Sequence, residues 1–118
     1  MTLKTGLEHV DSKAELKKLL ADNENVMVCC GRMGPMCIPV YGVMEGLREK
    51  YAHVAFRDMD YDGPASDAVA GLPECASFMG LPMTVYYKKG QVVAATSSIQ
   101  TAAQVTAILD EKFGAPAV

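Results

Sequence analysis

Four cysteines are the residues of this 118-residue chain best suited to carry out chemistry: Cys29, Cys30, Cys37 and Cys75. The chain has enough apolar residues for an ordinary core, so it needs no disulfide framework to fold. Its first residues lack the apolar segment of an export signal, so we expect a cytoplasmic protein. In that reducing compartment, cysteines serve as core residues, metal ligands or redox groups.

The composition narrows the class of protein. Half of the residues are hydrophobic and 21% are charged, which excludes a disordered or fibrous chain. Eleven basic and fourteen acidic residues give a net charge of −3, and no run of either sign is present. We therefore expect no nucleic-acid partner and no membrane contact, and no stretch is apolar enough to span a bilayer. The whole of 1–118 is expected to form one domain, with 113–118 as a flexible tail.

The elements around the cysteines follow from hydrophobic patterning. Ser12, with Glu15 three residues later, is typical of the start of a helix. The continuous apolar run 26–30 predicts a central strand that is buried on both faces. A Gly/Pro-containing turn over 31–35 leads into an amphipathic helix over 35–51. Cys29 and Cys30 thus lie in the strand, and Cys37 lies in the first turn of the helix.

The remaining elements complete an alternating α/β order. The pattern predicts a short edge strand over 7–10, a strand over 54–59, one or two short helices within 66–78, a hairpin of strands 83–87 and 92–96, and a final helix that begins at Thr101. The order β-α-β-α-β-α-β-β-α predicts a mixed sheet of about five strands with helices on both faces.

Three segments in this order resemble the thioredoxin family over nearly the whole chain. They are the strand, turn, cysteine and helix of 26–51, the segment Met79-Gly80-Leu81-Pro82-Met83-Thr84, and the strand–turn–strand segment of 85–93. The resemblance implies a thioredoxin-like α/β fold with a cis Leu81–Pro82 peptide bond. It also implies that Pro82 lies against the redox motif and helps to bind extended substrate segments.

The chain departs from the family at the redox motif, because it contains no Cys-x-x-Cys. One alignment places Met33 and Met36 at the two cysteine positions. A second, which keeps the following helix free of gaps, places Cys37 at the second position, and we prefer it. The family's attacking cysteine is missing in either alignment. Its buried aspartate is also missing, since that position falls on Met27 or Val28.

Cys37 is the strongest candidate for a reactive thiol, because the free N–H groups at a helix start favour a thiolate. The alternative is an inaccessible thiol beneath the turn. Cys30 is a candidate partner, and a Cys30–Cys37 disulfide is conceivable, with a buried apolar residue as the alternative. For Cys29 the favoured interpretation is a buried apolar residue. Cys75 is either a core residue or a resolving thiol that is reached across the Pro82 loop.

The resemblance also implies a substrate-binding groove near Cys37 and Pro82. Its candidate residues are Met33, Gly34, Pro35, Met36, Pro82 and Met83. Met79 would also lie there, and this methionine set could be packing, a peptide groove or a soft-metal site. No metal motif is present: the CC-x6-C spacing of Cys29, Cys30 and Cys37 lacks a clear fourth ligand, and neither histidine has ligands at zinc spacing.

The sequence therefore predicts an atypical thioredoxin-like thiol–disulfide redox protein that uses Cys37. The alternative is a redox-inactive peptide-binding module with a methionine-lined groove. We expect no cofactor and no bound metal. The expected partners are protein thiols or disulfides, or an extended peptide segment.

Overall fold

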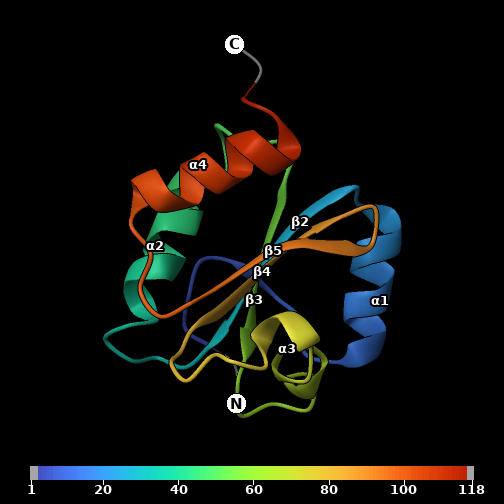
Figure 1. The fold of residues 1–118 in the computed structure, drawn as a ribbon, viewed down its shortest axis with the longest axis vertical. Coiled ribbons are helices and arrows are strands. Elements are labelled where there is room, and N and C mark those ends of the chain that lie inside the picture. The colour runs from blue at the N-terminus through green and yellow to red at the C-terminus, as the bar shows by residue number, and fades with distance from the viewer. Residues whose placement is uncertain (1–2, 117–118) are drawn as a thin grey trace.

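The computed structural model describes residues 3–116, which form one sheet flanked by helices (Figure 1). In chain order the elements are β1 (Glu8–His9), α1 (Lys13–Asp22), β2 (Asn25–Gly31), α2 (Ile38–Leu47), β3 (Ala55–Asp60), α3 (Asp67–Ala70), the 3₁₀ helix η1 (Pro73–Cys75), β4 (Met83–Lys88), β5 (Gln91–Ser97) and α4 (Ala102–Phe113). The predicted α/β order is confirmed.

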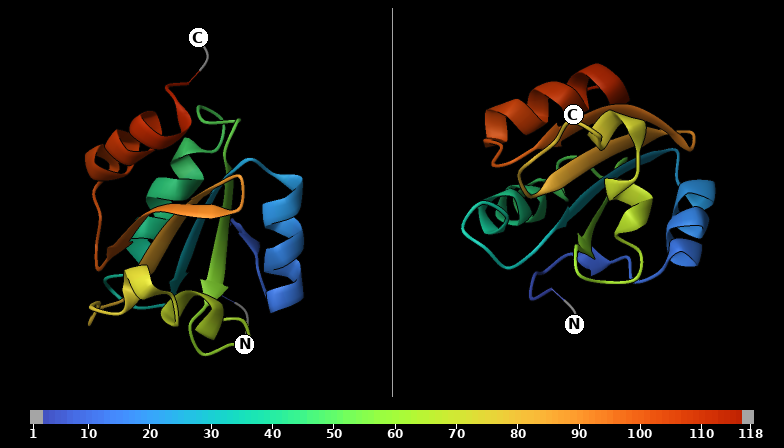
Figure 2. Two further views of the ribbon diagram at one scale, coloured as in Figure 1. Left: turned by 45° about the vertical axis from the view of Figure 1, so that its right-hand side comes forward. Right: turned by 60° about the horizontal axis from the view of Figure 1, so that its bottom comes forward.

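The sheet has five strands in the order β1-β3-β2-β4-β5. β3 runs parallel to both β1 and β2, whereas β4 is antiparallel to β2 and β5 is antiparallel to β4. Helices α2 and α4 cover one face, and α1 and α3 cover the other (Figures 1 and 2). The mixed, two-sided sheet predicted from the connectivity is therefore present.

β2 lies at the centre of this arrangement, and all seven of its residues are buried. Because side chains alternate along a strand, the two faces receive different residues. Met27 and Cys29 pack with α2 and α4, while Val28 and Cys30 pack with α1 and α3. The two adjacent cysteines thus belong to different halves of the core.

The predicted starts of α1 and α4 are confirmed. The Ser12 hydroxyl accepts a hydrogen bond from the Glu15 N–H at 3.1 Å. Thr101 and Gln104 form a full capping box, with each side chain bound to the backbone N–H of the other residue. These caps satisfy N–H groups that a helix cannot pair internally.

α2 is shorter than the predicted range 35–51. The Gly34 carbonyl accepts the N–H groups of both Cys37 and Ile38, so the chain forms a tight turn before the regular helix begins. At the other end, Tyr51 still donates its N–H to the Leu47 carbonyl at 2.9 Å. The Tyr51 hydroxyl then binds the Asp110 carboxylate at 2.7 Å, which ties this end of α2 to α4.

α4 contributes to the core as far as its last residue. Its buried face consists of Val105, Leu109 and Phe113. The predicted tail 113–118 is therefore wrong at its first residue, because the Phe113 ring packs in the core beside Tyr86. Residues 117–118 of that predicted tail lie outside the described residues. Between residues 3 and 116, no helix is long and apolar enough to cross a membrane.

Leu109 of α4 lies in the same core cluster as Cys29 and Cys37, so removing its side chain should destabilise this half of the core. We expect Leu109→Ala to lower the free energy of unfolding by about 2 to 5 kcal/mol, because it leaves a cavity at a fully buried site. Urea unfolding followed by far-UV circular dichroism measures this change. Glu111→Ala on the exposed face of the same helix should change it by less than about 0.5 kcal/mol. Equal losses in both variants would contradict this packing.

Candidate functional site

Cys37 stands at the junction between the turn and α2. It occupies the N-cap position, and its carbonyl accepts the N–H groups of Val40 and Tyr41. The thiol is directed inward, since Cys37 is only 3% exposed. The preferred alignment therefore places a buried thiol at the start of the second long helix.

The Cys37 thiol packs closely against the backbone of Gly31 and Arg32. The Arg32 N–H points at Cys37 Sγ with a donor–acceptor distance of 3.4 Å. A Cβ atom on Gly31 would lie 2.7 Å from both Cys37 Sγ and Tyr41 Oη, and 3.1 Å from the Pro82 Cβ. Real Cβ atoms do not approach other atoms so closely, so the thiol can sit here only because residue 31 is glycine.

Pro82 closes the site from the loop before β4. The Leu81–Pro82 peptide bond is cis, and the Pro82 carbonyl accepts the N–H of Ser98 at 3.0 Å. Ser98 has a left-handed backbone with φ 66°, a conformation that is more usual for glycine. The end of β2, the start of α2 and Pro82 therefore meet next to the Cys37 sulfur, and Ser98 at the end of β5 is bonded to Pro82.

The structure divides the four cysteines between the two faces of the sheet. Cys29 lies in the same core cluster as Cys37, whereas Cys30 and Cys75 lie together in the cluster beneath α1 and α3. The conceivable Cys30–Cys37 disulfide is thus disfavoured, because residue 30 points away from the face that Gly31 shares with Cys37. All four cysteines are free thiols.

Burial raises the pKa of three of these thiols and so disfavours their thiolate forms. Burial raises the pKa of Cys29 far above its usual range, even though a hydrogen bond from Thr84 acts against the shift. Burial likewise raises the pKa of Cys30 to about 12 and raises the pKa of Cys75. A protonated thiol is a poor nucleophile, so these three are badly suited to attack a disulfide.

The predicted substrate residues do not form a single methionine cluster. Met33 packs against the core on the α2 side, whereas Met83 belongs to the core cluster on the α1 side. Gly34, Pro35 and Met36 form the outer part of the turn, where Pro35 and Met36 are exposed.

A groove beside Pro82 is lined by Arg32, Tyr61, Phe78, Met79, Gly80, Leu81 and Met83.

Asp58 is an acid whose burial was not predicted from the sequence. It lies in β3, opposite Cys29 in the strand register, and is completely buried. The Thr5 hydroxyl donates to its Oδ2, and His9 Nδ1 lies 2.5 Å from its Oδ1. Burial raises the pKa of Asp58, although both hydrogen bonds act in the opposite direction. The sequence does contain a sign of this burial: Asp58 lies two residues after Phe56 in a strand, so both side chains point to the same face of the sheet.

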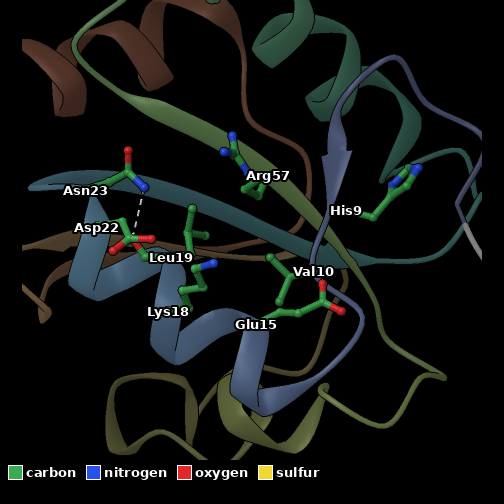
Figure 3. A pocket seen from close by; sticks show the side chains of 8 residues that line it. All are labelled: His9, Val10, Glu15, Lys18, Leu19, Asp22, Asn23 and Arg57. Atoms are coloured by element: carbon green, nitrogen blue, oxygen red, sulfur yellow. Dashed lines mark hydrogen bonds between the residues drawn. The ribbon is translucent and has the colours of Figure 1, made fainter.

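A second pocket lies far from the cysteine chemistry, between α1 and the strands β1 and β3. Figure 3 shows that Glu15, Lys18 and Arg57 lie along it, while the His9 side chain points away from α1. Both acidic and basic side chains line this pocket, and no cysteine lines it. Within residues 3–116, no group of three or more His, Cys, Asp or Glu side chains is arranged to hold a metal ion.

Comparison with known proteins identifies the fold. No family model and no curated protein sequence matches the chain. Among solved structures, a mutant thioredoxin from Halobacterium salinarum NRC-1 is 20% identical, with 94% of each chain covered and a TM-score of 0.75. Fasciola hepatica thioredoxin is 20% identical, with 89% of this chain and 98% of that chain covered and a TM-score of 0.75. Mitochondrial thioredoxin 3 from Saccharomyces cerevisiae is 23% identical, with 88% and 94% covered and a TM-score of 0.70. The chain has a thioredoxin-like fold.

The burial of the thiols predicts an order of reactivity. We expect Cys37 to be alkylated first in the native protein at pH 8, because it lies at a helix start beneath a short turn. Cys29 and Cys30 should stay unmodified, since burial keeps them protonated. Isotope-coded alkylation, with a second label added after unfolding, measures each site by mass spectrometry. Equal labelling of all four cysteines in the native state would contradict this order.

Proposed function

We propose that this protein is a thiol–disulfide redox protein of atypical design, in which Cys37 is the reacting group. The observation that carries this proposal is the position of Cys37 Sγ, against Gly31 and Pro82 and within reach of the Arg32 N–H. A backbone N–H directed at sulfur stabilises the negative charge of a thiolate. The similar solved structures are thioredoxins, which makes protein thiols and disulfides the natural partner class.

The proposed reaction is a disulfide exchange at one thiol. The Cys37 thiolate attacks one sulfur of a substrate disulfide, so a mixed disulfide forms and the other substrate sulfur leaves as a thiolate. The proton lost by Cys37 passes to solvent and is available to the leaving thiolate. An external thiol then attacks the Cys37 sulfur of the mixed disulfide, so the rest of the substrate leaves as its second thiolate and Cys37 is joined to the external sulfur. A second external thiol attacks that external sulfur, which restores the Cys37 thiolate and leaves the two external thiols as a disulfide, the source of the two electrons.

An external thiol fits the second step best. Cys30 and Cys75, the predicted resolving residues, pack on the opposite side of the sheet from Cys37. Gly34, where the preferred alignment places the family's attacking cysteine, has open space around it, because an added Cβ would meet no atom within 4 Å. A small thiol from a reducing compartment such as the cytoplasm could approach the mixed disulfide from this side.

The test is the removal of the reacting sulfur. We expect Cys37→Ser to lower the dithiothreitol-driven reduction of insulin disulfides at least tenfold and to trap no mixed disulfide. The measurement is the insulin turbidity rate, together with intact-mass detection of adducts. Cys75→Ser is the matched control, because it removes an equally buried thiol on the other face of the sheet. The redox proposal fails if Cys37→Ser reduces insulin as fast as the native protein.

A second function is favoured by a different observation. The thiol is almost completely covered, whereas large apolar side chains are exposed: Met36 and Ile38 on either side of Cys37 in the chain, Met79 in the loop before Pro82, and Ile99 next to Ser98. Met79 is 100% exposed and lines the groove beside Pro82. Exposed methionines adapt to differently shaped apolar partners, so a binding module for extended peptides is the alternative.

Two substitutions, Met79→Asp and Cys37→Ser, distinguish the binding function from the redox function. If the protein is a binding module, Met79→Asp should weaken the binding of an apolar peptide at least tenfold, while Cys37→Ser leaves the affinity unchanged. Fluorescence anisotropy with a labelled library of extended peptides measures both affinities. Ala103→Asp, an exposed substitution on α4, serves as the control for the added charge. Binding that survives Met79→Asp would remove the groove from consideration.

A further inference from the structure

Arg32 holds the turn over Cys37 by three contacts of different kinds. Its backbone N–H points at Cys37 Sγ at 3.4 Å, and its carbonyl accepts the Tyr41 hydroxyl at 3.1 Å. Its guanidinium group forms two hydrogen bonds of 2.8 Å to the two carboxylate oxygens of Asp62. One residue therefore touches the thiol and also fastens the turn to a loop 30 residues away.

The loop that receives Arg32 is itself fixed to the sheet. The Tyr61 N–H donates to the Gly31 carbonyl at 2.8 Å. The Tyr61 ring also lies beneath the guanidinium group, with 5.1 Å between the Arg32 Cζ and the ring centroid. The paired guanidinium lowers the pKa of Asp62, so this carboxylate stays ionised at neutral pH. The turn is thus fastened to a firm support.

Arg32 is attached through its backbone carbonyl to Tyr41 and through its side chain to Asp62, and these two attachments differ in strength. Tyr41 is buried in the core, so its hydrogen bond to the Arg32 carbonyl is a fixed attachment. The Arg32 and Asp62 side chains are 56% and 58% exposed, and exposed ion pairs contribute little stability. Exposed pairs are also screened by salt. The ion pair is therefore the end of the attachment that opens first.

We propose that the Arg32–Asp62 pair is a latch that limits access to Cys37. A partner reaches the thiol when the guanidinium group leaves the carboxylate and the turn over 33–36 moves away from the sulfur, while Tyr41 still holds the Arg32 carbonyl. This proposal rests on the proposed function, because it concerns access to the same thiol. Arg32 and Asp62 are positioning residues, and neither forms a bond to the substrate.

The latch is tested by the rate at which native Cys37 reacts with iodoacetamide, an uncharged reagent. Asp62→Asn and Arg32→Ala should each raise this rate about two- to fivefold, the factor expected when an exposed pair is lost. The double variant should react no faster than the faster single variant, because one interaction is removed in each case. The increase should be the same factor at every pH between about 6 and 9, since access rather than protonation changes.

Salt provides an independent measurement of the same opening. The alkylation rate of the native protein should rise with sodium chloride concentration towards the rate of Asp62→Asn. The rate of that variant should not change with salt, because it has no ion pair left to screen. A purely structural effect of the substitution would not produce this salt dependence in the native protein.

Asp67→Asn is the matched control. It breaks the Lys13–Asp67 pair, which has the same 2.8 Å distance and similar exposure but links α1 to α3, away from Cys37. This variant should alkylate at the native rate, and melting temperatures should show that all variants are folded. An unchanged Cys37 rate in Asp62→Asn overturns the latch, whatever the reductase activity is. A loss of the redox proposal appears instead as full insulin reduction by Cys37→Ser, so the two failures are distinguishable.

Discussion

The rest of the structure depends on the double burial of β2. Every residue of this strand is covered, by α2 and α4 on one side and by α1 and α3 on the other. A strand buried in this way cannot shift by one residue without moving each side chain to the wrong half of the core. Its register therefore determines that Cys29 shares a face with Cys37 and that Cys30 does not. The chemistry available to Cys37 follows from this division of the strand.

The same strand ends at Gly31, where the backbone comes close to the Cys37 thiol. Gly31 carries no side chain, and the thiol of Cys37, the hydroxyl of Tyr41 and the ring of Pro82 occupy the space next to it. An alanine there would need to displace sulfur and oxygen atoms that lie 2.7 Å from its Cβ. Glycine is thus a requirement of the sulfur site, because it lets the thiol pack against the strand.

Much of the fold could be predicted from the sequence, because its signals are local. The apolar run 26–30 and the caps at Ser12 and Thr101 depend on neighbouring residues, and the structure confirms them. The site was less predictable, because its contacts join residues that are distant in the chain. No sequence spacing could predict that Arg32 binds Asp62 or that His9 contacts Asp58. The side on which Cys30 lies depended on the exact strand register.

The site combines a covered thiol with exposed apolar side chains, and this combination constrains the proposed function. A disulfide bond must align with Cys37 Sγ to be attacked, yet the sulfur belongs to a residue that is 3% exposed and is held beneath the turn by Arg32. The apolar side chains of Met36 and Met79 are exposed without any movement. Under the proposed function, a partner would therefore bind first through apolar contact and meet the thiol only after the proposed opening of the turn. In such an order, apolar contact determines which partners bind, and the opening of the turn determines how fast the sulfur reacts.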